Sequence, residues 1–217
     1  MMKRKSNNNG VVPEPTLRRL PWYLAFLKLL RARGEVVVSS TQIAKNTGVD
    51  SALVAKDLSF VSIVGKTRVG YDVAEIVEVL EEFLGFNDQH KAYILGVGNL
   101  GAALMHDRGL EQFGMEIVGG FDIRDTMVGS TIGGSPVYHI DSLPEIKTPE
   151  VTVGILTVPI DVAQSVTDKA VEAGLTAIWN FTPTRILVPK GVTLQNTSIY
   201  SHLAVMYHRI EEQDRRR

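Results

Sequence analysis

The stretch that decides the fold is Ala92-Tyr93-Ile94-Leu95-Gly96-Val97-Gly98-Asn99-Leu100-Gly101. An apolar run of strand length leads directly into three glycines spaced G-x-G-x-x-G, and a helical pattern follows. In this setting the first glycine allows a tight turn, the second lets a phosphate approach the backbone, and the third lets helix and strand pack closely. The stretch therefore predicts a dinucleotide site at a helix N-terminus. The alternatives are a purely structural turn and another nucleotide ligand, such as coenzyme A.

Outward from this stretch, residues from 91 onward alternate short apolar runs with helical segments, the pattern of βαβ units around a parallel sheet. We expect strands at 92–95, 117–121, 136–138, 151–158, 177–179 and 192–194. Helices are expected near 99–109, 141–146, 161–173 and 198–212. This pattern predicts a Rossmann-like α/β domain with a doubly wound parallel sheet over residues 88–197.

Polar residues follow the ends of several predicted strands, which is where such sheets bind ligands. Asp122 follows the second strand, and a carboxylate there can accept hydrogen bonds from both ribose hydroxyls and repel a 2′-phosphate, which favours NAD over NADP. Arg124 weakens that preference, since it could pair with a phosphate or with Asp125. Segments 156–160 and 180–183 reach the same rim, although each could be a strand end followed by a proline turn. The candidate cofactor-binding residues are Gly96, Val97, Gly98, Asn99, Leu100, Gly101, Asp122, Ile123, Arg124, Thr157, Val158, Pro159, Asn180 and Phe181.

The charge is unevenly distributed along the 217 residues. Residues 1–71 carry 12 Lys and Arg against 4 Asp and Glu, whereas residues 72–217 carry 11 against 20. The net charge of −1 thus combines a basic module of +8 with an acidic one of −9. A clustered basic module is typical of nucleic-acid binding, because phosphate contacts release counterions. The alternative is a solvated basic face.

The basic module has the pattern of a winged helix. Thr16 is expected to cap a helix with apolar positions Leu17, Leu20, Leu24, Leu27 and Leu30, and a tight turn at Gly48 separates two further helices within 40–61. Segment 65–71 predicts a hairpin with a basic tip, and Asp72 with Glu75 predicts a capping box. We expect a flexible basic arm over 1–15, this domain over 16–87, and a C-terminal helix and tail over 198–217.

The second helix of the pair would enter the DNA major groove, and the hairpin would contact phosphates or the minor groove. Each of these side chains could instead be an ordinary surface group. The candidate DNA-binding residues are Ser51, Lys56, Ser59, Lys66, Thr67 and Arg68.

Several classes of function are disfavoured. The chain has no cysteine, and its five histidines show neither metal-ligand spacing nor a catalytic partner, so we expect no metal site, no catalytic residues and no enzyme. The most apolar segment, 20–30, contains Lys28 and is too short to span a membrane. The sequence thus predicts a cytoplasmic protein without a membrane partner.

The motifs together are similar to those of one family. Leu20-Pro21, Lys56-Asp57-Leu58-Ser59, the segment 65–71, Gly98-Asn99-Leu100-Gly101, Phe121-Asp122, Leu156-Thr157-Val158-Pro159 and Asn180-Phe181-Thr182-Pro183 closely resemble the Rex family of redox-sensing transcriptional repressors. The resemblance implies a homodimer, with a C-terminal helix swapped onto the partner subunit. It also implies that the dimer binds palindromic operators in double-stranded DNA when NADH is scarce and leaves them when NADH binds.

This chain departs from the family pattern at several positions. Thr67 and Arg68 replace the usual arginine and glycine of the wing, and Ala55 stands where an arginine often precedes the recognition lysine. Asp107, Ser198 and Ile199 differ from a tyrosine and an Asp-aromatic pair that some members carry. The alternatives to a redox repressor are a regulator that responds to coenzyme A or another nucleotide, and an NAD-dependent dehydrogenase.

Overall fold

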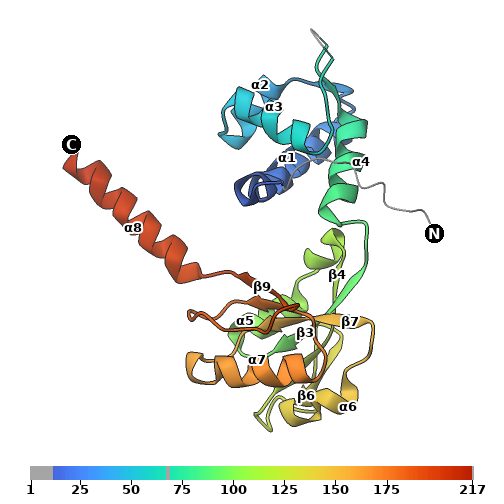
Figure 1. Cartoon of the computed structure of the whole chain (residues 1–217), viewed down its shortest axis with the longest axis vertical. Helices are drawn as coiled ribbons and strands as arrows, with labels where there is room; N and C mark the ends of the chain where they lie inside the picture. The colour runs from blue at the N-terminus through green and yellow to red at the C-terminus, as the bar shows by residue number, and fades with distance from the viewer. Residues whose placement is uncertain (1–11, 67–68, 217) are drawn as a thin grey trace. The chain divides into compact units, whose positions relative to one another are not determined.

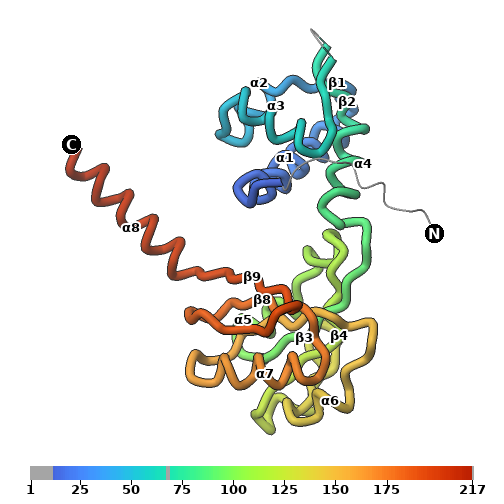
Figure 2. Tube along the Cα trace, in the orientation of Figure 1, coloured from blue at the N-terminus to red at the C-terminus, as the bar shows by residue number. Residues whose placement is uncertain are grey.

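The computed structural model describes residues 12–66 and 69–216, and the chain divides between Asp88 and Gln89 into two compact units. Figures 1 and 2 follow the chain from α1 to α4 in the first unit and from β3 to α8 in the second. We describe each unit by itself.

The N-terminal unit contains four helices and a two-stranded sheet among its described residues. Their bounds are α1 Glu14–Ala32, β1 Val37–Val38, α2 Ser40–Thr47, α3 Ser51–Phe60, β2 Tyr71–Asp72 and α4 Val73–Leu84. Side chains of Ser39, Asp50 and Asp72 cap the starts of α2, α3 and α4, while Gly48 and Gly85 end α2 and α4 in the left-handed conformation. Local sequence therefore sets most helix ends of this unit.

A small antiparallel sheet forms the wing. β1 pairs with β2, and an isolated antiparallel bridge joins Lys66 to Gly70. Gly70 has φ +100°, and a Cβ there would lie 2.5 Å from the Val38 carbonyl oxygen, so this turn requires glycine. The two helices α2 and α3 and this wing form a winged-helix unit.

The first helix differs from the prediction. α1 begins at Glu14 behind Pro13, so Thr16 lies inside it, is buried, and does not cap it. A proline is well placed in the first helical turn because its missing N–H would have no partner there. Leu17 is 39% exposed and lies outside the core, whereas Leu20, Leu24 and Leu27 are fully buried.

The second unit is built on a seven-stranded sheet. Its elements are β3 His90–Leu95, α5 Asn99–His106, η1 Leu110–Phe113, β4 Met115–Asp122, β5 Thr131–Ile132, β6 Ser135–His139, η2 Ile140–Ser142, α6 Leu143–Ile146, β7 Val151–Leu156, η3 Ile160–Val162, α7 Ala163–Glu172, β8 Ala177–Asn180, β9 Thr193–Asn196 and α8 Ile199–Arg215.

The strand order is β5-β6-β4-β3-β7-β8-β9, and every neighbouring pair except β5 and β6 is parallel. The six parallel strands follow the order 3-2-1-4-5-6 of the Rossmann fold, with the switch point between β3 and β7. The predicted fold class is confirmed. The antiparallel edge strand β5 was not predicted, because two residues are too short to show a pattern.

Alternate residues of β3 face two different cores. Tyr93 and Leu95 pack with residues of α6 and α7, whereas Ala92 and Ile94 pack with Met105 of α5. Helices thus cover both sheet faces, and α5 and α7 flank the strands in Figure 1. This arrangement puts the glycine loop and the ends of β4 and β7 at the carboxyl edge of the sheet.

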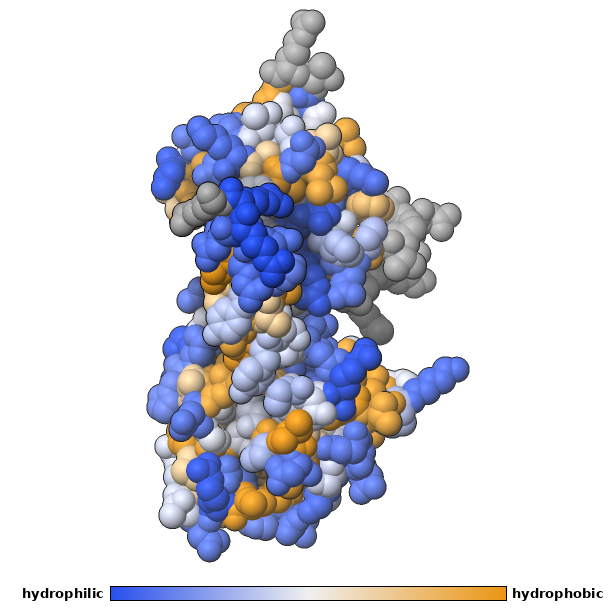
Figure 3. Space-filling view, turned by 90° about the vertical axis from the view of Figure 1, so that its left-hand side faces the viewer, coloured by the Kyte–Doolittle hydropathy of each residue, from blue (hydrophilic) through white to orange (hydrophobic). Residues whose placement is uncertain are grey.

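The C-terminal helix has no buried residue, and Tyr200, Met206 and Ile210 are among its exposed apolar side chains. On the face shown in Figure 3, hydrophobic and hydrophilic side chains are interspersed over each unit. The swapped position expected for this helix needs a partner subunit and stays a prediction.

Candidate functional site

The three glycines of the loop between β3 and α5 meet different surroundings. Gly96 has φ +96°, and a Cβ there would lie 2.6 Å from the Val158 side chain. At Gly101 an added Cβ would collide with the Gly96 carbonyl oxygen. At Gly98, by contrast, a Cβ would meet no described atom within 4 Å. Turn geometry and packing therefore account for Gly96 and Gly101, but Gly98 leaves open space beside the backbone.

The start of α5 lies beside this space. Gly98 is its N-cap, and none of the described side chains caps the first turn. Backbone N–H groups of a first turn have no partner within the helix and favour an anion. The Thr157 hydroxyl donates a hydrogen bond of 2.6 Å to the Gly96 carbonyl oxygen, which ties the loop to the end of β7. This bond fixes the loop at Gly96 and leaves the space beside Gly98 open.

A cleft of about 620 Å³ opens over the loop. It brings together residues that follow β3, β4, β6 and β7 with one side of α7. Its lining consists of Gly96, Gly98, Phe121, Asp122, Ile123, Arg124, Ile140, Thr157, Val158, Pro159, Asp161, Val162, Ser165, Val166 and Lys169. Many of these are apolar, as expected of a site for a ring system with a few polar anchors.

The structure places eight of the predicted cofactor-binding residues in the lining, namely Gly96, Gly98, Asp122, Ile123, Arg124, Thr157, Val158 and Pro159. The other six lie outside it: Val97, Asn99, Leu100, Gly101, Asn180 and Phe181. Val97 is buried in the core that contains α5.

Asn180 and Phe181 have structural partners. The Asn180 side chain accepts hydrogen bonds from Thr182 and donates to the Thr184 carbonyl oxygen and to Asn196. Phe181 packs against the Trp179 ring at 4.7 Å between ring centres. In this structure their side chains hold the end of β8, which agrees with the alternative of a strand end followed by a turn.

Asp122 has a different environment from the one expected. Its carboxylate accepts hydrogen bonds from the backbone N–H of Val97 at 2.7 Å and from Arg124, whose Nε and Nη2 each lie 3.0 Å from one of its oxygens. Arg124 also donates from Nη2 to the Val97 carbonyl oxygen at 2.7 Å. Arg124 therefore pairs with Asp122 and closes over the loop.

Two opposing effects act on the pKa of Asp122. Burial opposes the charged form, but hydrogen bonds from the Arg124 side chain and from two backbone N–H groups outweigh it and lower the pKa. The carboxylate stays ionised at neutral pH and would repel a 2′-phosphate.

The sequence analysis missed the part of the cleft formed by Ile140 of η2, by η3 and by α7. Val162, Ser165, Val166 and Lys169 follow helical spacing and face the cleft, and Lys169 forms an ion pair with Asp141 at 2.5 Å. The signal was present as i, i+3, i+4 and i+7 spacing after β7, but no motif distinguishes it from an ordinary core-facing helix.

The winged-helix unit carries a second candidate surface. On α3, Lys56 and Ser59 are exposed and Ser51 is partly exposed, while Val54, Asp57 and Leu58 are buried. Lys66 is exposed on the wing, and Thr67 and Arg68 lie outside the described residues. A groove of about 540 Å³ between α3 and the wing is lined in part by Ser59 and Lys66.

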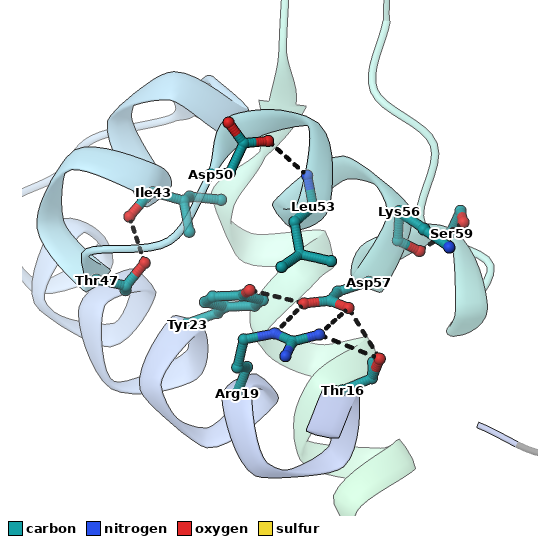
Figure 4. Close-up of polar contacts among 10 residues, drawn as sticks. All are labelled: Thr16, Arg19, Tyr23, Ile43, Thr47, Asp50, Leu53, Lys56, Asp57 and Ser59. Atoms are coloured by element: carbon teal, nitrogen blue, oxygen red, sulfur yellow. Dashed lines mark hydrogen bonds and ion pairs between the residues drawn. The ribbon is translucent and has the colours of Figure 1, made fainter. Parts of the chain in front are cut away.

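Beneath this surface, a buried carboxylate joins α3 to α1 (Figure 4). Asp57 accepts hydrogen bonds from Thr16 Oγ1 at 2.9 Å, Tyr23 Oη at 2.7 Å, and Arg19 at 2.7 and 2.8 Å. Neither Arg19, Tyr23 nor Asp57 was a predicted functional residue. We call these four residues, Thr16, Arg19, Tyr23 and Asp57, the Asp57 brace.

Within residues 12–66 and 69–216, no group of three or more acidic or histidine side chains could hold a metal ion. None of the helices in the same ranges is long and apolar enough to cross a membrane.

Two family models match the chain. Residues 11–59 match a model described as "Putative DNA-binding protein N-terminus", and residues 87–184 match one described as "CoA binding domain".

Curated relatives match nearly all of the chain. A protein of Porphyromonas gingivalis is 58% identical over 97% of this chain and 99% of its own length. A protein of Bacteroides thetaiotaomicron is 56% identical over 92% and 91%. Both are named redox-sensing transcriptional repressor Rex.

Solved structures give the same result. A Rex-family repressor, RSP, in complex with β-NAD⁺ and operator DNA has a TM-score of 0.88 and 31% identity, covering 94% of each chain. The complex of RSP with β-NADH has a TM-score of 0.83, covering 94% of this chain and 96% of RSP.

A winged helix joined to a dinucleotide fold defines a ligand-responsive DNA-binding regulator rather than an enzyme. The identities over nearly the full length then specify the family. The chain belongs to the Rex family of redox-sensing transcriptional repressors, as its motifs predicted.

Proposed function

We propose that this chain binds operator DNA through its winged-helix unit and leaves the DNA when its second unit takes up NADH. The similarity to RSP, which has been solved with NAD⁺ and operator DNA and with NADH, supports this proposal. For the cofactor, the observation that carries it is Gly98, where the backbone at the start of α5 borders open space in the cleft, as the close approach of a phosphate requires.

The residues present fit a dinucleotide. The first turn of α5 and the backbone at Gly98 would hold the pyrophosphate, and Asp122 would face the adenosine ribose. Ile123, Ile140 and Val166 offer apolar surface for a base. When bound, the cofactor supplies the redox state that is sensed, and Thr157 keeps the loop in position.

For DNA, we assign Ser51, Lys56 and Ser59 of α3 to the major groove and Lys66 of the wing to phosphates, since these side chains are wholly or partly exposed. The same role for Thr67 and Arg68 stays a prediction from the sequence.

We also propose a homodimer in which α8 docks on the partner subunit. A helix of 17 residues that buries none of its side chains while exposing Tyr200, Met206 and Ile210 would gain stability from such a surface. The dimer would act in the cytoplasm, where bacterial DNA lies.

The test is a calorimetric titration of the full chain with NADH, NAD⁺ and coenzyme A in parallel. A sensor shifts its equilibrium only by differential affinity, so NADH should bind much more tightly than NAD⁺. Coenzyme A is the second candidate because residues 87–184 match a model named for it. Equal affinity for NADH and NAD⁺, or preferential binding of coenzyme A, would overturn redox sensing.

Two variants locate the site. Gly98→Ala should fold normally and bind NADH at least tenfold more weakly, because the added methyl group occupies the space left for the ligand. Gly119→Ala is the matched control: Gly119 lies in β4 outside the cleft lining, and its added Cβ would have neighbours no closer than 3.4 Å.

Linkage supplies the functional test. Saturating DNA must weaken NADH binding by the same factor by which NADH weakens DNA binding. A titration with and without a bound duplex measures this factor, and an unchanged NADH affinity would contradict the proposed mechanism.

A further inference from the structure

The helix that we assign to the major groove, α3, has a charged residue on its buried face. Val54 and Leu58 pack in the core of the winged-helix unit, and Asp57 lies beside them with no exposed surface. Apolar side chains would be the simple choice at such a position, since an ionised carboxylate is costly to remove from water. The structure compensates for this cost with the other three members of the Asp57 brace.

Each oxygen of the Asp57 carboxylate accepts two hydrogen bonds from the brace. Oδ1 accepts from Thr16 and Arg19 Nη2, and Oδ2 accepts from Tyr23 and Arg19 Nε. Thr16, Arg19 and Tyr23 lie on one face of α1, at i, i+3 and i+7. No buried side-chain nitrogen or oxygen of the described residues lacks a hydrogen bond, so the group is fully satisfied.

Such a pair is a poor device for stability alone. A buried ion pair replaced by apolar side chains of similar volume is often as stable or more stable. What distinguishes this ion pair is its geometry. A planar guanidinium that donates two parallel hydrogen bonds to a carboxylate restricts the relative orientation of the two groups. Apolar contacts between α1 and α3 would allow α3 to rotate or slide by small amounts.

By fixing the orientation of α3, the brace also fixes the directions of the exposed side chains on that helix. Lys56 is the residue before Asp57, and Ser59 follows two positions later, both on the exposed face of α3. Because successive residues of an α-helix are about 100° apart, holding Asp57 sets the direction of Lys56. Base contacts in the major groove depend on such directions, whereas phosphate attraction depends mainly on charge.

We propose that the Asp57 brace positions α3 for sequence discrimination, and that Arg19, Tyr23 and Thr16 are positioning residues for DNA recognition although none of them touches DNA. The inference rests on the proposed function, since it assumes that α3 reads operator bases. The brace therefore contributes to the ratio of operator to non-specific affinity. Compared with a complete replacement by apolar side chains, it adds little to stability, and it adds little to electrostatic attraction for DNA.

The test replaces the whole brace by apolar residues of similar shape: Thr16→Val, Arg19→Met, Tyr23→Phe and Asp57→Leu in one full-length chain. This quadruple variant keeps the net charge, because one cation and one anion are lost together. The matched control is Glu14→Gln with Arg18→Met, which removes an exposed ion pair of 2.7 Å from the same helix, again without a net charge change.

The probes are a duplex enriched by the wild-type chain from a random-sequence pool and a scrambled duplex of the same composition, both without NADH. We expect the quadruple variant to bind the enriched duplex at least tenfold more weakly, with unchanged affinity for the scrambled duplex and an unchanged salt slope. The control should match the wild type on both duplexes. An unchanged ratio, or equal weakening on both duplexes, would overturn the inference.

If the quadruple variant does not fold, the same ratio of affinities is measured with Tyr23→Phe. This variant removes one hydrogen bond of 2.7 Å and leaves the ion pair intact. A ratio lowered by about threefold or more supports the brace, and an unchanged ratio refutes it. A wild-type chain that enriches no duplex would overturn the proposed function and with it the inference. NADH titration in the absence of DNA separates this outcome from general damage to the chain.

Discussion

Among the described residues, each unit contains one buried aspartate paired with an arginine, and the two pairs differ in how their arginines are held. In the first unit, Arg19 is 18% exposed and lies 38 positions from Asp57, on another helix. In the second, Arg124 is 52% exposed and lies two positions after Asp122, just beyond the end of β4. Asp57 is fully buried, and Asp122 is 7% exposed at the rim of the cleft.

The difference shows what each pair can do. The Arg19 pair joins two helices, and opening it would take two of its four hydrogen bonds from a fully buried carboxylate, so the pair holds a fixed geometry. Arg124 can swing into water at little cost, since its guanidinium is half exposed and surface pairs are weak. The first pair therefore suits a scaffold, and the second suits a site where a ligand displaces one partner.

The largest expected effect is on stability in the first unit. Asp57→Ala should lower the free energy of unfolding of the winged-helix unit by about 3–5 kcal/mol, because it leaves Arg19, Tyr23 and Thr16 without their shared acceptor. Urea unfolding of the full chain measures it. A loss below about 1 kcal/mol would mean that the pair is no more fixed than a surface pair, and the comparison would fail.

A pH series tests the charge on the same group. Burial opposes ionisation of Asp57, but hydrogen bonds from Arg19, Tyr23 and Thr16 prevail and hold its pKa below the ordinary 3.8. Its contribution to stability is therefore fully present above that value and is lost as the pH falls through the folded-state pKa. The stability difference between the wild type and Asp57→Asn, followed from neutral pH downward, should shrink in this acid range. A difference that stays constant there would contradict the assignment.

Asp122→Asn addresses ligand choice in the second unit. Removing the carboxylate charge should reduce the preference for NADH over NADPH by about tenfold, which is about 1.4 kcal/mol, because the 2′-phosphate is no longer repelled. Parallel titrations with the two cofactors measure the ratio. If the ratio does not change, Asp122 serves only the loop, through its hydrogen bonds to Val97 and Arg124.

The smallest effect is expected for Arg124→Met, which should leave the urea midpoint of the full chain unchanged. The matched change in the first unit, Arg19→Met, should lower the midpoint clearly, since it leaves the Asp57 carboxylate buried with fewer donors. Equal shifts in the two variants would erase the distinction between a fixed and a releasable pair.

The sequence predicted the parts of the molecule that local patterns determine. Three glycines at fixed spacing located the loop before α5, and Asp72, predicted as a cap, does cap the start of α4. The continuous apolar run 92–95 predicted a strand, and the structure buries side chains on both faces of β3. Asp122 was singled out because it follows the second predicted strand.

The features that it missed depend on contacts distant in sequence. Thr16 looked like a helix cap because a threonine precedes an apolar run, yet Pro13 starts the helix earlier and Thr16 bonds to Asp57, 41 positions away. Asn180 looked like a rim residue because it ends a strand, and only the structure shows its bonds to Thr184 and Asn196. No local pattern carries such pairings.

The hydrophobic cores described above follow the division of the chain. One core contains only residues before position 89, and the other two contain only residues after it. In genetic terms, a core substitution in one unit should abolish either DNA binding or cofactor binding and leave the other intact. Alleles blind to redox state yet still repressing should map after position 89, and alleles that have lost repression yet still bind the cofactor should map before it.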